Sequence, residues 1–162
     1  MASYVKIVHK AIAQIRSHDD TKVLGYIELN EDMDGTTHIF GNLTGLAPGK
    51  HGIHIHEKGD PRKCCDALGG HYNPFHKDHG NIKDTNRHVG DLGNITFDGS
   101  GKCQFSLFDK QKLVRITGPY SVIGRSIIIH EGKDDLGLGG FEDSKTNGHS
   151  GKRVAYGIIG YV

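Results

Sequence analysis

Six histidines and one aspartate stand along the chain in an order that suits a pair of metal ions. They are His54, His56, His71, His79, His88, Asp91 and His130. Imidazole is a ligand for both copper and zinc, so ligand type alone does not assign the metals. His71 is a candidate for both sites, which requires that both of its ring nitrogens bind. A bridged pair of metals of this kind predicts a narrow range of chemistry.

The first of the two sets begins with His54 and His56, which lie two residues apart in a segment of strand character. Residues i and i+2 of a strand point to the same face, so the two imidazoles can chelate one metal. Alone the pair is weak evidence, because His-x-His pairs are common at protein surfaces. His130, at the end of another apolar segment, adds a third ligand, although a lone histidine there is more often a buried structural residue.

The second set follows in a stretch of weak strand pattern. His71, His79, His88 and Asp91 offer three nitrogens and one oxygen, which suits a tetrahedral zinc ion. His88 and Asp91 are three residues apart, across a turn that contains Gly90. Seven side chains of ligand type clustered in this order are far beyond chance.

The elements that must position these ligands are short strands separated by turn signals such as Asp34-Gly35 and Pro48-Gly49. The pattern predicts an all-β fold, an antiparallel sandwich or barrel of roughly eight strands. Two stretches, 57–87 and 131–152, lack the strand pattern, and loops this long in a small domain are usually functional or disordered. Metal ligation would order them, so we expect functional loops. The expected strands cover residues 11–16, 23–29, 37–43, 52–56, 92–97, 103–108, 126–130 and 154–159.

Composition narrows the class of protein. The 162 residues suit one domain, 1–162, and 24 glycines indicate many tight turns. A net charge of +1 gives no electrostatic footprint for nucleic acid or for an anionic membrane. No apolar run approaches the roughly 20 residues of a membrane helix, and the first residues lack the apolar stretch of a signal peptide. Three cysteines form no even framework, so we expect free thiols and a cytoplasmic location.

The motifs around the candidate ligands resemble those of Cu,Zn superoxide dismutase. The resemblance runs in order and spacing from about residue 11 to the C-terminus, with residues 1–10 as an N-terminal extension. The motifs are HGIHIHE at 51–57, GHYNP at 70–74, RHVGDLGN at 87–94, IGRS at 123–126 with His130-Glu131, DDLG at 134–137 and GIIG at 157–160.

The resemblance implies an all-β fold, an eight-stranded antiparallel Greek-key barrel or sandwich of immunoglobulin-like type with two long functional loops. It also implies a role for each ligand. Copper would be held by His54, His56, His71 and His130, and zinc by His71, His79, His88 and Asp91, with His71 as the bridging imidazolate. Asp134 would accept hydrogen bonds from His54 and His79 and so couple the two metals. His51 would be structural, and Arg153 would stand over the copper, where it attracts and orients superoxide.

The implied reaction is superoxide dismutation as part of antioxidant defence. Two superoxide anions become molecular oxygen and hydrogen peroxide as copper is alternately reduced and oxidised, while His71 takes up and releases a proton. Zinc stays redox-silent. The substrate is a small anion, so a locally positive funnel raises its encounter rate, and Lys145 and Lys152 are candidate contributors beside Arg153.

The chain departs from the family pattern in two places. The family carries a disulfide between the first long loop and the last strand; the loop cysteine is present as Cys65, but its partner position holds Tyr156. Cys103 lies on another strand, so we expect no bridge and no need for a copper chaperone that oxidises it. Lys58 stands where an aromatic residue often lies near the dimer contact, yet Ile123-Gly124 and 158–162 still resemble a dimer face. We expect a homodimer.

Two other classes of function remain open at this point. The chain could be a catalytically silent metal-binding or decoy homologue, or a protein that stores metal in the same site. A silent homologue should lack a metal ligand or the arginine, whereas both ligand sets, Asp134 and Arg153 are present. The missing disulfide is the one feature in its favour. Metal content and superoxide consumption, measured on one preparation, separate these classes.

Overall fold

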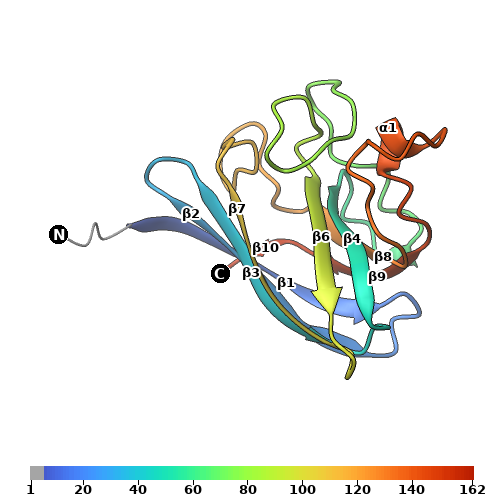
Figure 1. The fold of residues 1–162 in the computed structure, drawn as a ribbon. Helices are drawn as coiled ribbons and strands as arrows, with labels where there is room; N and C mark the ends of the chain where they lie inside the picture. The colour runs from blue at the N-terminus through green and yellow to red at the C-terminus, as the bar shows by residue number, and fades with distance from the viewer. Residues whose placement is uncertain (1–5) are drawn as a thin grey trace.

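The strands form one antiparallel sheet that curls into a nearly closed barrel (Figure 1). The structure is a computed structural model and describes residues 6–162. Eight strands follow the order β6-β4-β8-β9-β1-β2-β3-β7, and the short β10 pairs with β1. The all-β prediction with eight main strands is confirmed. The bounds are β1 Ile7–Ser17, β2 Val23–Asp32, β3 Thr37–Thr44, β4 Gly49–His56, β5 Arg62–Cys65, β6 Asp91–Phe97, β7 Lys102–Asp109, β8 Ser126–His130, α1 Ser144–Asn147, β9 Arg153–Ile158 and β10 Gly160–Tyr161.

Alternation of apolar and polar residues builds the core inside the barrel. On β2 and β3 the side chains of Ile27, Leu29, Ile39 and Leu43 are buried, and their neighbours along each strand are more exposed. Burial of one such side chain contributes about 1.5–3 kcal/mol. The remaining strands close the same core around them.

The strands β4 and β8 differ because they are buried on both faces. From His51 to His56 every residue of β4 is buried, and so is every residue of β8. Ile53 and Ile55 pack in the barrel core, while His54 and His56 occupy the opposite face. The two long loops and α1 lie on that side of the sheet (Figure 1). The loops therefore cover the ligand face and bury the side chains of His54 and His56.

Three local features differ from the sequence-based expectation. Strand β1 begins at Ile7 rather than at residue 11, and its first residues pair with β2, Ile7 opposite Asp32. Ile7 and Val8 are both exposed, so this part of the strand carries no alternation that would reveal it. The first long loop contains the short strand β5, and the second contains the four-residue helix α1. Residues 1–5 of the expected extension lie outside the described residues.

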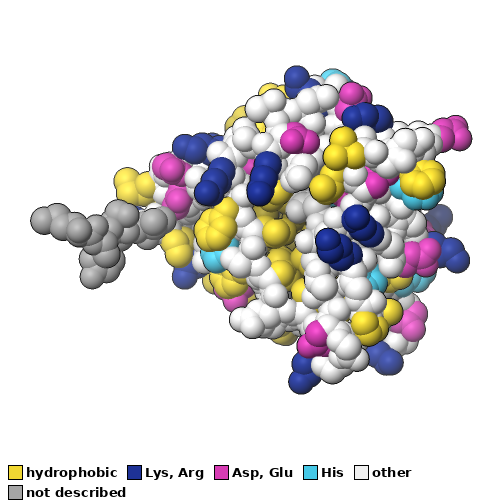
Figure 2. Space-filling view, viewed as in Figure 1, with side chains coloured by type: hydrophobic (Ala, Val, Ile, Leu, Met, Phe, Trp, Pro, Cys, Tyr) yellow, Lys and Arg dark blue, Asp and Glu magenta, His cyan; other side chains and the backbone are white. Residues whose placement is uncertain are grey.

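On the face shown in Figure 2, Lys and Arg side chains are interspersed with Asp and Glu. This agrees with the net charge of +1. Within residues 6–162, no helix has the length and apolar character needed to cross a bilayer.

Candidate metal centre

The first ligand set is assembled from two strands and one loop. His54 and His56 project from the loop-covered face of β4, and His130 ends the neighbouring β8. His71 reaches the same point from the first long loop, which is tied to β4 by a bridge between His56 and His71. One nitrogen from each of the four rings lies within 4.8 Å of the others.

One ring nitrogen of each histidine in this set is left available to bind a cation. His54 Nδ1, His56 Nε2, His71 Nε2 and His130 Nε2 are buried and have no hydrogen-bond partner among the described residues. A buried polar atom left in that state costs about 1–3 kcal/mol, so four of them at one point need an explanation. A copper ion bound by four imidazole nitrogens supplies it.

The opposite ring nitrogens fix the orientation of three of these imidazoles. His54 Nε2 lies 2.7 Å from Asp134 Oδ2, His56 Nδ1 lies 2.8 Å from the Gly69 carbonyl oxygen, and His130 Nδ1 lies 2.9 Å from the Gly151 carbonyl oxygen. Each of these oxygens accepts the ring proton, which leaves the lone pair on the nitrogen that faces the centre.

The second ligand set has the dimensions of a zinc site. His71 Nδ1 and His79 Nδ1 each lie 2.9 Å from Asp91 Oδ1, and His88 Nδ1 lies 3.1 Å from the same oxygen. His71 Nδ1 and His88 Nδ1 are 3.2 Å apart. Ligands at 2.0–2.1 Å in a tetrahedron around zinc stand about 3.3 Å apart, close to these separations. Three nitrogens and one oxygen therefore surround a point that fits Zn²⁺.

His71 belongs to both sets by its geometry. Its Nδ1 faces Asp91 and His88, and its Nε2 faces the first set. The ring is almost fully buried, and burial lowers its pKa. An imidazole that presents one nitrogen to each of two ligand sets is the arrangement that the sequence indicated.

Asp134 lies behind both sets and touches one ring of each. Its Oδ2 accepts from His54 Nε2, and its Oδ1 accepts from His79 Nε2, both at 2.7 Å. The carboxylate is fully buried. Asn94 fixes its backbone through two hydrogen bonds of 2.9 and 2.8 Å. A carboxylate held in this way sets the tautomer and orientation of both rings.

Burial controls protonation in the first set. Burial lowers the pKa of His54 and His56 well below the ordinary value, and neighbouring imidazoles act in the same direction. Burial also lowers the pKa of His130, to about 4. These rings are therefore neutral at pH 7 without any metal, which is the state that copper ligation requires.

Carboxylates control protonation in the second set. Burial favours the neutral ring of His79, but hydrogen bonds to Asp134 and Asp91 outweigh it and raise the pKa to about 9. For Asp91, burial opposes ionisation, yet hydrogen bonds from three imidazoles hold its pKa well below the usual range. Without metal, the protonated His79 thus balances the charge of the ionised Asp91, and zinc binding displaces that proton from His79.

Arg153 places a positive charge beside the first set. It stands opposite His130 where β8 pairs with β9. Its Nη1 donates to the Cys65 carbonyl oxygen at 2.6 Å, and its Nη2 donates to the Gly69 carbonyl oxygen at 2.5 Å. The same Gly69 oxygen accepts the bond from His56. Lys145 and Lys152, by contrast, are exposed on the second long loop.

Sequence reasoning missed a buried ion pair that supports the zinc set. Arg87 is 1% exposed and donates through Nη2 to Asp109 Oδ1 at 2.5 Å. Its Nη1 donates to the backbone oxygen of Asp91 at 2.6 Å. Arg87 therefore braces the turn that carries His88 and Asp91 against β7. The motif contained Arg87, but no signal in the sequence pointed to Asp109.

The first departure from the family pattern, Tyr156 in place of a cysteine, lies close to the site, because Tyr156 packs with Cys65, whose carbonyl oxygen accepts from Arg153. Cys64, Cys65 and Cys103 are free thiols in the structure. Cys65 is fully buried and packs in a small apolar cluster with Tyr156.

His51, expected to be structural, places its two ring nitrogens against the carbonyl oxygens of His130 and Ala47 at 2.6 and 2.8 Å.

Comparisons with known proteins agree with this geometry. The family model for copper/zinc superoxide dismutase matches residues 23–159. Superoxide dismutase (Cu-Zn) 2 of Mesembryanthemum crystallinum is 44% identical over 153 residues, which are 94% of this chain and 96% of that protein. The crystal structure of the clock protein EA4 superposes with a TM-score of 0.88 at 41% identity, over all of both chains. Both ligand sets, Asp134 and Arg153 lie inside the residues that the family model matches.

Proposed function

The chain belongs to the copper/zinc superoxide dismutase family, and on that premise we propose a role for each residue of the metal centre. The protein converts two superoxide anions and two protons into molecular oxygen and hydrogen peroxide. Its cofactors are copper and zinc. One observation carries the assignment of residues: four unpartnered imidazole nitrogens converge at one point, and one of the rings also completes a tetrahedral set.

Copper is held by His54, His56, His71 and His130, and zinc by His71, His79, His88 and Asp91. When bound, copper supplies one-electron transfer to and from superoxide, and zinc is redox-silent. The all-nitrogen set and the mixed set support this order, since carboxylate oxygen with three imidazoles is typical of zinc. Asp134 keeps the rings of His54 and His79 in the tautomers that both sets need.

His71 is the proton carrier of the site. Its Nδ1 stays turned toward Asp91, and its Nε2 is the nitrogen that takes up a proton and hands it to the reduced oxygen species. The ring is almost fully buried and its Nδ1 contacts Asp91 and His88, which restrict its rotation. A proton held at a fixed nitrogen beside the reacting oxygen avoids a slow delivery from bulk water.

Arg153 binds and orients the anion. Two carbonyl oxygens fix its guanidinium, so its orientation is set before superoxide arrives. A preorganised cation attracts a small anion at no cost of side-chain ordering during the encounter. Lys145 and Lys152 extend the positive field along the rim of the second long loop.

The assembly, maturation and location follow as further parts of the proposal. A homodimer through Ile123, Ile158 and the C-terminal residues is supported by apolar side chains there, of which Tyr161 is 62% exposed and Val162 77%. Sedimentation analysis tests it, and a monomer at micromolar concentration contradicts it.

Three cysteines without a well-placed pair support a cytoplasmic protein that acquires copper without an oxidising chaperone. Cell fractionation, and copper loading of the reduced protein in vitro, test these two points.

The bridging role of His71 has a direct spectroscopic test. Cobalt(II) in the zinc set and copper(II) in the copper set couple magnetically if one imidazolate joins them. We expect the copper EPR signal to disappear in the mixed derivative and to return in the His71→Ala variant. His76→Ala, a change of another histidine in the same loop, is the matched control. A full copper signal in the mixed wild-type derivative contradicts the bridge.

A silent metal-binding homologue is not favoured. Such a protein would lack part of the machinery, whereas all seven ligands come together and Arg153 stands beside them. The clock protein EA4 has this fold although its name is not that of an enzyme. In this chain, however, both ligand sets and Arg153 are complete.

A further inference from the structure

Tyr156 packs against the loop segment that holds Arg153. It lies on β9, three residues after Arg153, and is only 4% exposed. Its ring packs with Cys65, Leu68 and Ile128 in a cluster separate from the barrel core. Cys65 and Leu68 belong to the loop segment 64–69, which carries both carbonyl oxygens that hold Arg153. One side chain thus connects the last long strand to the segment that orients the guanidinium.

The hydroxyl of Tyr156 ties the same cluster to a third element. It donates to Asp20 Oδ1 at 3.2 Å, in the turn between β1 and β2. Asp20 also accepts from Arg16, which is the cross-strand partner of Tyr156. Burial raises the pKa of Tyr156 to about 12, and Asp20 and Cys64 act in the same direction. The hydroxyl therefore stays protonated and remains a donor at any physiological pH.

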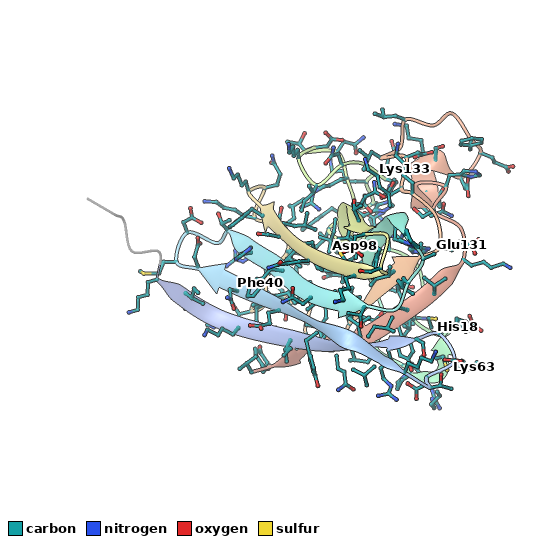
Figure 3. All side chains as sticks on the ribbon, turned by 60° about the horizontal axis from the view of Figure 1, so that its bottom comes forward. His18, Phe40, Lys63, Asp98, Glu131 and Lys133 are labelled. Atoms are coloured by element: carbon teal, nitrogen blue, oxygen red, sulfur yellow. The ribbon has the colours of Figure 1, made fainter. Side chains whose placement is uncertain are left out.

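A second contact joins the β1–β2 turn to the loop. His18 Nε2 lies 3.5 Å from Asp66 Oδ1. Figure 3 shows His18 and Lys63 at the same end of the molecule. The segment 64–69 is thus held from two sides, by the turn through Asp66 and by β9 through Tyr156. Both contacts are non-covalent.

We propose that Tyr156 is a positioning residue for Arg153, acting through its ring contact with the loop segment 64–69. The ring fills the space between β9 and Cys65, and so fixes the Cys65 and Gly69 carbonyl oxygens that orient the guanidinium. Gly69 also accepts from His56, so the same segment sets one copper-set imidazole. The proposal rests on the proposed role of Arg153 as the anion-binding residue.

The guanidinium of Arg153 is held by the backbone of the loop segment 64–69. Both hydrogen bonds of its guanidinium reach backbone oxygens of a loop, and a loop holds its shape only as firmly as its packing allows. Removal of the Tyr156 ring leaves a cavity beside Cys65, which neighbouring atoms fill only in part. The carbonyl oxygens then shift, and the guanidinium loses its fixed direction while every metal ligand remains.

A double-mutant cycle with azide as the anion probe tests the proposal. Azide binding to the copper- and zinc-loaded protein is followed by absorption, in wild type, Tyr156→Leu, Arg153→Ala and the double variant. We expect Tyr156→Leu to weaken azide binding toward the level of Arg153→Ala. In the Arg153→Ala background the same change should have an effect of less than about twofold, because residues that act as one unit are not additive.

Three controls keep the test specific. Tyr156→Phe retains the ring and should bind azide like wild type. Tyr26→Leu, an exposed tyrosine on β2, should also leave azide affinity unchanged. Metal content of every variant is measured beside it. The inference is overturned if Tyr156→Phe loses as much azide affinity as Tyr156→Leu. It is also overturned if Tyr156→Leu loses the same azide affinity in the wild-type and the Arg153→Ala backgrounds. An Arg153→Ala variant that binds azide like wild type overturns instead the proposed role of Arg153.

Discussion

Reversal of the charge at Arg153 should slow dismutation much more than it changes metal content. Arg153 is no ligand, but its guanidinium shares the Gly69 carbonyl oxygen with His56 and stands opposite His130. Two unit charges at roughly 5 Å in water interact by about 0.8 kcal/mol, so exchange of Arg for Glu changes the anion's energy by roughly 1.7 kcal/mol. Since each 1.36 kcal/mol is a factor of ten in rate, Arg153→Glu should lower kcat/KM at least about 15-fold at low salt.

The assay is pulse radiolysis of the metal-loaded protein over a range of ionic strength. The wild-type rate should fall as salt rises, because the screening length is about 10 Å at 0.1 M. The Arg153→Glu rate should fall less or rise. Lys152→Glu carries the same change of net charge one residue away, on an exposed side chain, and should slow the reaction far less. Equal effects of the two reversals, or a wild-type rate in Arg153→Glu at low salt, would refute this role for Arg153.

Three further outcomes follow from the packing. In Gly148→Ala a Cβ would clash with Asp134 Oδ1 and His79 Nε2, so we expect loss of metal affinity by calorimetric titration; Gly140→Ala has the same kind of positive φ but open space around it, and should only lower stability by about 1–2 kcal/mol. Reductant should leave the melting temperature nearly unchanged, whereas zinc removal should lower it clearly, because a ligand bound only to the folded state adds stability; a fall with reductant alone would reveal a disulfide. Burial raises the pKa of Cys65 to about 11, so the native thiol should resist iodoacetamide at pH 8 and react after unfolding, as mass mapping can show; rapid native alkylation would contradict its burial.

Much of the fold could be predicted from local pattern. The alternation along residues 23–29 and 37–43 identified β2 and β3 because each strand has one face in the core. The pair His54 and His56 could be placed on one face for the same reason of period two. The ligand sets come together as the sequence indicated because the loop that carries His71 lies against β4.

The remaining features depend on contacts that no local pattern encodes. The Arg87–Asp109 pair joins residues 22 apart in sequence, and the Tyr156–Asp20 bond joins residues 136 apart. Strand β5 forms from Arg-Lys-Cys-Cys, a sequence without alternation, where the loop packs on β9. The first residues of β1 gain backbone pairing with β2 while Ile7 and Val8 stay exposed. Tertiary context decides each of these, so only the structure could supply them.

Metal stoichiometry and dismutation, measured on one purified preparation, test the assignment of this centre most directly. Elemental analysis of the reconstituted protein should find one copper and one zinc per chain, with superoxide consumption that chelation removes and the metals restore. Two ligand sets that share His71 require this ratio. Stable binding of zinc alone, with no superoxide consumption after copper is supplied, would contradict it.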